Sequence, residues 1–322
     1  MPPTLTASSA SSNHVMASGS ALRPWEIRMS DGVRLTLERR GDPAGPRVFF
    51  CHGAGLASRC FENFLDQLAA THDVFSLDLR GHGWNASKGG SRFDIERARR
   101  DFDEIAQAIS QRHGSKPLHG VFHSVSAALA LWSQADAAPF SSLVLYEPAL
   151  PPPPGEQNAL FEHARFRAPL TTRRRRAFYE SVEDLQTSLA GNLASRLPPN
   201  AARALSAGLL RPAADGGYEL CCSPEIEAST YEGIRDIDIW SKLVNIDIPV
   251  LVLCGRPRGL PEYTSELSPR IADFAKFDLM ILDGLDHQGW IAQPQRLARM
   301  TATFIGTLDA SSSPAAEACS QS

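Results

Sequence analysis

The sequence predicts an α/β protein, with a mostly parallel, doubly wound sheet and a helical segment inserted into it. Two observations predict this class. Short apolar runs alternate with amphipathic stretches over residues 33–146, and strands that alternate with helices at this spacing form a parallel sheet with helices on both faces. The pattern stops at four consecutive prolines, residues 151–154, and resumes only at residues 249–254.

The first half of the sheet takes its strands from short apolar or alternating runs. We expect strands at residues 33–38, 48–51, 74–79, 118–122 and 143–146. We expect the helices between them at residues 59–70, 95–112 and 125–134. In the second of these helices, apolar residues recur at helical period, at Ile95, Ala98, Phe102, Ile105, Ala108 and Ile109.

The four prolines interrupt the sheet, because proline cannot continue a helix or a central strand. From residue 156 to residue 240 the sequence predicts helices only, with an irregular piece at residues 211–224. Strands are then expected at residues 249–254 and 279–282, and a helix at residues 295–308 closes the fold. An insertion of this length predicts a cap or lid over the sheet.

These elements divide the chain into five parts. Residues 1–21 are rich in Ser and Ala and have no acidic residue, and residues 311–322 are again rich in Ser and Ala. Both segments are expected to be disordered tails, since they bury too little apolar surface to offset the entropy of ordering. The α/β core is expected to occupy residues 22–150 and 241–310, and the helical cap residues 151–240.

The composition excludes several classes of function. Hydrophobic residues make up 43% of the 322 residues and the net charge is −4, so nothing points to nucleic acid or a membrane as partner. The six cysteines show no metal-ligand spacing and are expected to be buried thiols in a reducing compartment. We therefore expect a cytoplasmic protein that acts on a small molecule without a metal or other cofactor, and we leave open whether it forms a homodimer.

The first candidate site is Phe122-His123-Ser124-Val125-Ser126, between a predicted strand and a predicted helix. In so tight a turn the serine hydroxyl projects above the sheet. The N–H of Val125 then lies at a helix N-terminus, where a developing oxyanion is favoured. A serine between a strand and a helix is also a routine N-cap, so this segment alone leaves both interpretations open.

The second candidate is His52-Gly53-Ala54-Gly55, which follows the predicted strand at residues 48–51. Glycine lets backbone N–H groups approach a ligand closely. We therefore expect Gly53 and Ala54 in an oxyanion-binding loop, with the Ala54 N–H as the second donor. A plain strand-to-helix turn is an equally good interpretation of this segment by itself.

The third candidate is His287, which follows the last predicted strand within Leu285-Asp286-His287-Gln288. Open α/β sheets bind their ligands at the carboxyl ends of the strands, and all three candidate segments lie there. At that edge His287 can reach Ser124 and act as its base.

In this order, the segments resemble the α/β-hydrolase superfamily. The sequence Asp78-Leu79-Arg80-Gly81-His82-Gly83 resembles the superfamily's D-x-R-G-x-G turn, and the whole resemblance extends over roughly residues 25–308. Ser124 lies where the superfamily has G-x-S-x-G, although Phe122 and Ser126 replace both glycines. The resemblance implies the α/β-hydrolase fold with an inserted helical cap, and a serine hydrolase with a Ser–His–acid triad.

The acid of such a triad holds the histidine tautomer and stabilises the imidazolium. The superfamily usually places it just after the strand at residues 250–254, where this chain has Gly255-Arg256-Pro257-Arg258-Gly259 and no carboxylate. Glu147 ends the strand after the serine, which is the alternative position used by some members. We expect Glu147 to be the acid in preference to Glu262, the first carboxylate downstream.

The pocket is expected between Ser124 and the cap. Six aromatic residues are candidates to line it: Phe161, Phe166, Phe178, Tyr179, Tyr231 and Trp240. The run Arg173-Arg174-Arg175-Arg176 is interpreted as a solvated helix face, because consecutive residues on a helix point in different directions.

The leading functional hypothesis is hydrolysis of a mid-sized, largely apolar ester, thioester or lactone through an acyl-enzyme on Ser124. One alternative keeps the fold but assigns C–C bond hydrolysis, or acyl transfer or cyclisation of a secondary metabolite. A further alternative is a ligand-binding protein with little turnover, which is suggested by the missing glycines and the missing late acid.

Overall fold

The computed structural model describes residues 23–311, except residues 89, 191–195, 236, 260–261 and 274–276. The expected tails lie outside the described residues, apart from Ser311, which ends the last helix. Among the described helices, none is long and apolar enough to cross a lipid bilayer.

One eight-stranded sheet forms the centre of the molecule, in the strand order β1-β2-β4-β3-β5-β6-β10-β11. Strand β2 pairs antiparallel with β1 and β4, and the other neighbours pair parallel. The bounds are β1 (Arg23–Arg28), β2 (Arg34–Gly41), β3 (Arg47–Cys51), β4 (Asp73–Leu77), β5 (Leu118–His123), β6 (Ser142–Tyr146), β10 (Val250–Arg256) and β11 (Asp278–Asp283). The predicted α/β class and mostly parallel sheet are confirmed.

The sequence does not predict the edge strand β1. It lies at the margin of the sheet, and of its six residues only Ile27 is buried. A strand that buries one side chain carries no alternating pattern, so its signal is absent from the sequence.

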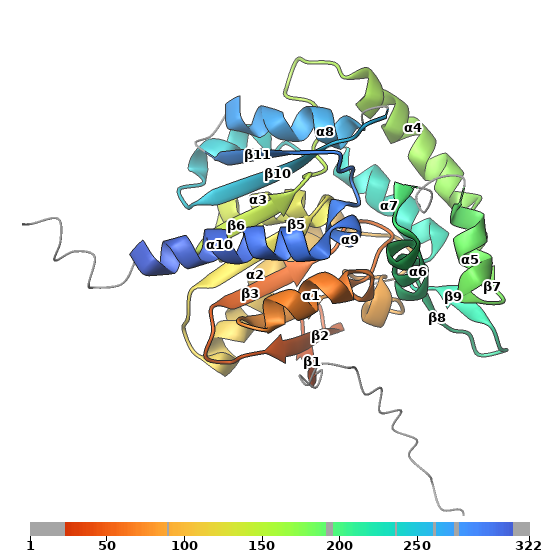
Figure 1. The fold of residues 1–322 in the computed structure, drawn as a ribbon, viewed down its shortest axis with the longest axis horizontal. Helices are drawn as coiled ribbons and strands as arrows, with labels where there is room; N and C mark the ends of the chain where they lie inside the picture. The colour runs from red at the N-terminus through yellow and green to blue at the C-terminus, as the bar shows by residue number, and fades with distance from the viewer. Residues whose placement is uncertain are drawn as a thin grey trace, which may run out of the picture.

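Helices cover both faces of the sheet (Figure 1). Helices α1 and α10 pack together on one face, and α2 and α3 pack together on the other. Their bounds are α1 (Glu62–Ala69), α2 (Ile95–His113), α3 (Val125–Ala137) and α10 (Pro294–Ser311). Successive strand residues point to opposite faces, so Phe49 packs in the core under α2 and α3 while Phe50 packs in the core under α1 and α10.

Between β6 and β10 the chain leaves the sheet and forms the cap, which we define as elements α4 to α7 with β7 to β9. These elements lie together at one end of the sheet (Figure 1). The helices are α4 (Ala159–Arg173), α5 (Val182–Leu189), α6 (Pro199–Gly208) and α7 (Pro224–Ile234).

The expectation that residues 156–240 form helices only, apart from an irregular piece at residues 211–224, is wrong, because short strands also form. A small antiparallel sheet, in the order β7-β9-β8, consists of β7 (Phe178–Tyr179), β8 (Leu210–Pro212) and β9 (Tyr218–Leu220). Strands of two or three residues are too short to show a period of two, which explains why the sequence did not reveal them.

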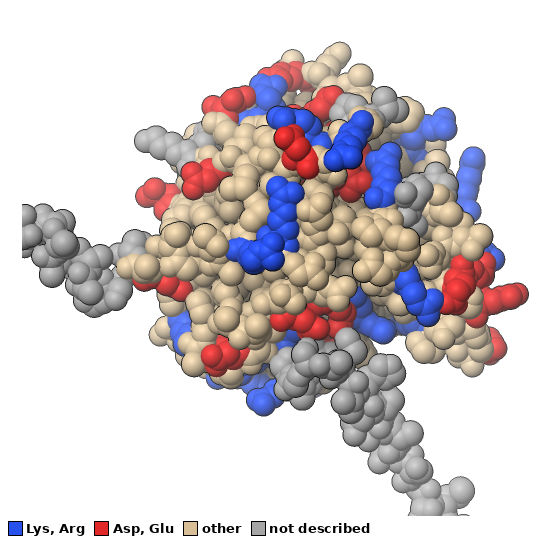
Figure 2. All heavy atoms as spheres, in the orientation of Figure 1, with Lys and Arg blue, Asp and Glu red and all other residues tan. Residues whose placement is uncertain are grey.

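Charged side chains of both signs are interspersed over the visible face of the molecule, in agreement with the small net charge (Figure 2). Five cysteines lie within the described residues, and all are buried free thiols: Cys51, Cys60, Cys221, Cys222 and Cys254. Cys319 lies outside the described residues.

Candidate active site

Ser124 lies at the sharp turn between β5 and α3, with a φ of 58° and a ψ of −118°. A positive φ costs a non-glycine residue on the order of 1–3 kcal/mol, so its surroundings must hold this conformation. The Ser124 N–H donates to the Tyr146 carbonyl at 3.0 Å, and the Ala149 N–H donates to the Ser124 carbonyl at 3.1 Å. The turn therefore fixes Ser124 at the carboxyl end of β5.

The side chains that replace the two glycines of the superfamily pattern have specific places. Ser126 accepts a hydrogen bond from the His123 N–H at 3.0 Å, and its hydroxyl lies 2.7 Å from the Cys51 carbonyl, to which it donates. Phe122 points into the core, where its ring lies over Gly120; a Cβ atom at residue 120 would overlap that ring. The missing glycines are thus accommodated, and the turn keeps its shape.

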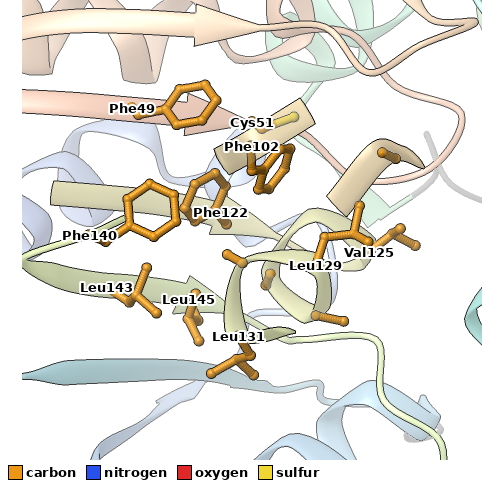
Figure 3. Close-up of a cluster of buried hydrophobic side chains, with 14 of the residues drawn as sticks. Phe49, Cys51, Phe102, Phe122, Val125, Leu129, Leu131, Phe140, Leu143 and Leu145 are labelled. Carbon is orange, nitrogen blue, oxygen red and sulfur yellow. The ribbon is translucent and has the colours of Figure 1, made fainter. Parts of the chain in front are cut away.

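The Phe122 ring belongs to a buried aromatic group beneath α2 and α3 (Figure 3). It stacks on Phe102 with ring centroids 5.1 Å apart and meets Phe49 edge to face at 5.5 Å. Such pairs add about 0.5–1.5 kcal/mol to the free energy gained from burial alone. The large residue before the serine turn therefore has a role in the core.

The structure brings His287 between Ser124 and Glu147. Its Nε2 lies 3.0 Å from Ser124 Oγ, and its Nδ1 lies 2.7 Å from Glu147 Oε2. Burial alone would lower the pKa of His287, but the hydrogen bond to Glu147 and the negative charges of Glu147, Glu262 and Asp286 together outweigh burial and raise the pKa above its ordinary value. Three side chains from the ends of different strands thus form one hydrogen-bonded chain.

Glu147 directly follows β6; it is fully buried and has a left-handed backbone conformation, with a φ of 43°. The Gly255 N–H donates to its Oε1 at 2.9 Å, and the Thr264 hydroxyl donates to its Oε2 at 2.8 Å. Gly255 has to be a glycine, because a Cβ there would lie 2.6 Å from the Leu285 carbonyl oxygen. The Glu147 carboxylate therefore contacts the end of β10, the strand after which the superfamily usually places the acid.

The two other carboxylates near His287 have different partners. Glu262 caps α8 (Tyr263–Leu267) in a reciprocal pair with Ser265, and it accepts a hydrogen bond from Arg196 at 2.8 Å. Asp286 accepts a hydrogen bond from the Gln288 N–H at 2.9 Å. Among the described residues, neither carboxylate hydrogen-bonds to His287.

Two buried side chains that the sequence did not single out fix the backbone around His287. Burial holds the pKa of His123 well below its ordinary value, so the neutral ring donates from Nε2 to the His287 carbonyl at 2.9 Å. The Tyr146 hydroxyl donates to the Asp286 carbonyl at 2.6 Å. His123 and Tyr146 directly precede Ser124 and Glu147 in the sequence. The ends of β5 and β6 therefore carry Ser124 and Glu147 and also fix the backbone at His287.

Gly53 brings the loop after β3 against the serine turn. A Cβ at Gly53 would lie 2.8 Å from the Cβ of Ser124, so only glycine allows this approach. Within the described part of the chain, no hydrogen bond occupies the N–H groups of Ala54 and Val125. The Gly55 N–H, by contrast, donates to His82 Nε2 at 3.1 Å.

Two buried histidines hold this loop in place. His52 contacts the Gly53 carbonyl through Nδ1 at 2.7 Å and accepts from the Leu79 N–H at 3.2 Å. Burial, reinforced by His52, lowers the pKa of His82 to about 3, so His82 is neutral and its Nε2 accepts from Gly55. His82 belongs to the Arg-Gly turn of the sequence, which therefore supports the neighbouring loop.

One trio of possible metal ligands occurs among the described residues. One ligand atom each from Glu147, Glu262 and His287 lie within 4.8 Å of one another. Two of the three are already joined by the hydrogen bond between His287 and Glu147, so a cation would have to displace that proton. The arrangement fits an acid–base pair better than a metal cage.

Comparison with protein families settles the assignment of the chain. A model described as "Alpha/beta hydrolase family" matches residues 48–300. The chain belongs to this family. The prediction of a hydrolase of the α/β-hydrolase fold is therefore confirmed.

One curated protein and one solved structure are similar to this hydrolase over almost its whole length. The 2-(acetamidomethylene)succinate hydrolase of Mesorhizobium japonicum is 24% identical over 297 residues, which are 90% of this chain and 99% of the relative. The crystal structure of E-2-(acetamidomethylene)succinate hydrolase has a TM-score of 0.71 at 19% identity and covers 89% of this chain and 100% of its own.

Other solved structures share the fold at lower similarity. An N-formylmaleamic acid deformylase from Pseudomonas putida has a TM-score of 0.61 at 14% identity and covers 87% of this chain and 100% of its own. An esterase from Rhodococcus has a TM-score of 0.66 at 20% identity and covers 89% of this chain and 99% of its own. At such identities the likeness shows the fold alone.

A cavity of about 440 Å³ opens above Ser124 and His287, between the sheet and the cap of the hydrolase. Of the six aromatic candidates, only Phe161 and Tyr231 line it, and Tyr263 adds a third ring. Phe166 and Phe178 are more than half exposed, whereas Tyr179 and Trp240 pack in the core.

The wall of the cavity is more polar than the sequence suggested. Arg175 lines the cavity, so the interpretation of the whole arginine run as a solvated face is wrong at this residue. Its guanidinium pairs with the buried carboxylate of Glu227 on α7, to which the Tyr231 hydroxyl donates at 3.0 Å. Arg175 lies between α4 and β7 and Glu227 lies on α7, so only the folded structure reveals the pair.

Proposed function

We propose that this protein is a serine hydrolase in which Ser124 is the nucleophile, His287 the base and Glu147 the acid. The supporting observation is the hydrogen-bonded chain from Ser124 Oγ through both nitrogens of His287 to the buried Glu147 carboxylate. It opens on a cavity large enough for a small molecule. The Ala54 and Val125 N–H groups, held beside Ser124 by Gly53, are the proposed oxyanion donors.

In the proposed reaction Ser124 Oγ attacks the acyl carbon of the substrate while His287 Nε2 takes the hydroxyl proton. The oxyanion that forms accepts hydrogen bonds from Ala54 and Val125. When the bond to the leaving group breaks, His287 delivers the proton to that group. Water then attacks the acyl-enzyme and gives its proton to His287, which returns it to Ser124.

The substrate bond is proposed to join an acyl group to nitrogen. The names of the relatives describe a succinate that carries an acetamido group and a maleamic acid that loses a formyl group. They favour the alternative hypothesis, in which the fold is kept but the chemistry is C–C bond hydrolysis, acyl transfer or cyclisation, over ester, thioester or lactone cleavage. Both names, however, point to an acyl–nitrogen bond rather than to the C–C bond that this hypothesis named.

We also propose that the substrate carries a carboxylate. Arg165 and Arg235 line the cavity, and among the described residues the Arg235 side chain hydrogen-bonds only to the Glu232 carbonyl, at 3.2 Å. Arg175 is neutralised by Glu227. Arg235 therefore offers its charge to a ligand, in keeping with the succinate named in the relatives.

The proposed nucleophile is tested with a fluorophosphonate probe. The native protein should be labelled at Ser124, and Ser124→Ala should not be labelled. A native protein that binds ligands but takes up no probe and gives no burst of product would support the ligand-binding alternative instead.

The proposed substrate charge is tested with two chromogenic esters of similar shape, mono-p-nitrophenyl succinate and p-nitrophenyl 4-methylpentanoate. The anionic ester should have the larger kcat/KM. The variant Arg235→Met should lose that preference while it keeps its rate on the neutral ester. Equal effects of Arg235→Met on the two esters would contradict the assignment.

The proposed bond is tested by product analysis on an N-acyl amino dicarboxylate, the matching O-acyl ester and a β-diketone. Release of the amine supports acyl–nitrogen cleavage. Cleavage of the ester alone, or of the β-diketone alone, would instead support the ester hypothesis or the C–C hypothesis.

A further inference from the structure

Thr264 lies beside the proposed acid and base and has no role in the reaction described so far. It is 2% exposed on α8, and its hydroxyl donates to Glu147 Oε2 at 2.8 Å. The same oxygen atom of Thr264 lies 3.2 Å from His287 Nδ1. One hydroxyl therefore contacts both partners of the acid–base pair.

These contacts close a ring of hydrogen bonds. Glu147 Oε2 accepts from both His287 Nδ1–H and the Thr264 hydroxyl. Because this hydroxyl gives its only proton to Glu147, it can only accept at His287 Nδ1, 3.2 Å away. Both contacts favour the tautomer of His287 that carries its proton on Nδ1. This tautomer leaves Nε2 free to accept the proton of Ser124.

The hydroxyl is available because of its position in the helix. Thr187, Thr230 and Thr301 each donate to the carbonyl four residues back in their own helices. Thr264 is the second residue of α8, so its helix holds no such carbonyl. Its hydroxyl has to find a partner elsewhere, and the Glu147 carboxylate is that partner.

The position of α8 is fixed from both sides. Its capping residue Glu262 pairs with Arg196 of the chain between α5 and α6, and Tyr263 packs edge to face on Phe161 of α4, with ring centroids 5.5 Å apart. On the sheet side, the Ser268 hydroxyl donates to the carbonyl of Pro148, next to Glu147, at 3.1 Å. These contacts hold the Thr264 hydroxyl beside the Glu147 carboxylate.

We propose that Thr264 is a positioning residue that sets the orientation of Glu147 and the tautomer of His287. The proposal rests on the proposed function, because it requires His287 to act as the base for Ser124. It goes beyond the triad, since it assigns to α8 a contribution to the reactivity of Ser124.

The test uses the rate at which a fluorophosphonate labels Ser124, because that rate requires an activated serine but no knowledge of the substrate. In Thr264→Val, which keeps the shape but removes the hydroxyl, the rate should fall roughly tenfold or more. Thr264→Ser should retain a rate within about threefold of the parent. If Thr264→Val perturbs folding, Thr264→Ala is compared with Thr264→Ser instead, because these two variants differ only in the hydroxyl.

A spectroscopic measurement separates positioning from mere stability. The Nδ1 proton of His287 should give a low-field proton resonance in the parent and in Thr264→Ser, and the resonance should be shifted or lost in Thr264→Val and Thr264→Ala. Unchanged labelling and an unchanged resonance in folded Thr264→Val and Thr264→Ala would overturn the proposal. Failure of the parent itself to be labelled would refute the proposed function instead, so the two failures are distinguishable.

Discussion

At the scale of single residues, the proposed acid is defined by what surrounds it. Glu147 is enclosed at the end of β6, and each of its carboxylate oxygens accepts at least one hydrogen bond from a neighbouring element. Glu262 lies nearby but caps a helix and pairs with a half-exposed arginine. Closeness to His287 therefore does not distinguish the two carboxylates; the hydrogen bond between His287 Nδ1 and Glu147 is what supports the proposed assignment.

Replacing each of these two glutamates by glutamine is expected to separate their roles. Glu147→Gln keeps the shape but removes the charge that stabilises the imidazolium, so turnover should fall by about 10²–10⁴. Glu262→Gln, the matched control, should stay within a few fold of the parent. Steady-state turnover on an activated ester measures both, and equal activity of Glu147→Gln and the parent would remove the assignment.

The pH dependence of activity follows from His287. As the proposed base, His287 must be neutral to take the proton of Ser124, so activity should be lost as pH falls through the pKa of His287. Because the pKa of His287 is raised, this loss should be centred above pH 6.5, the ordinary value for histidine. In Glu147→Gln the main cause of the raised pKa is gone, and the midpoint of kcat/KM against pH should move to lower pH.

At the scale of elements, the ends of β5, β6 and β10 lie so close together that one added Cβ atom would overlap a neighbouring residue. Gly255 at the end of β10 leaves no room for a side chain, since a Cβ there would lie 2.9 Å from Glu147 Oε1. The close approach of β10 is what lets its backbone N–H donate to that carboxylate.

The variant Gly255→Ala is therefore expected to displace Glu147 and lower the labelling rate of Ser124 at least tenfold. Gly259→Ala is the matched control, because a Cβ at Gly259 would meet no atom within 4 Å. Thermal unfolding followed beside probe labelling checks that both variants are folded. If Gly255→Ala labelled as fast as Gly259→Ala, the packing argument would fail.

The packing of Phe122 in the core beneath the serine turn leads to a second prediction at this scale. Phe122→Gly restores the first glycine of the superfamily pattern, yet here it should destabilise the protein by about 3–5 kcal/mol, the usual cost of deleting a buried phenylalanine ring. The reason is the aromatic group of Phe49, Phe102, Phe122 and Phe140, which would lose a central member (Figure 3). Urea unfolding measures the difference; a variant as stable as the parent would show that the ring is dispensable.

At the scale of the whole molecule, the sequence predicts the order of strands and helices along the chain, because each predicted element has its own pattern of apolar residues. The edge strand β1 and the small cap sheet have no such pattern, so the sequence did not predict them. Local motifs and the absence of a carboxylate after β10 predicted Ser124, His287 and Glu147 as candidate site residues, and the structure brings their side chains within hydrogen-bond distance. The contacts of Arg175 with Glu227 and of Thr264 with Glu147 join residues far apart in the chain, and no local pattern marks them.

The insertion of the cap also has a consequence for how the protein is made. Ser124 and Glu147 precede the cap in the chain, and His287 follows it. A growing polypeptide that has just finished the cap thus holds the proposed nucleophile and acid but lacks the proposed base. If the proposed triad is the active site, Ser124 is activated only once the last strand and its loop have been synthesised and docked.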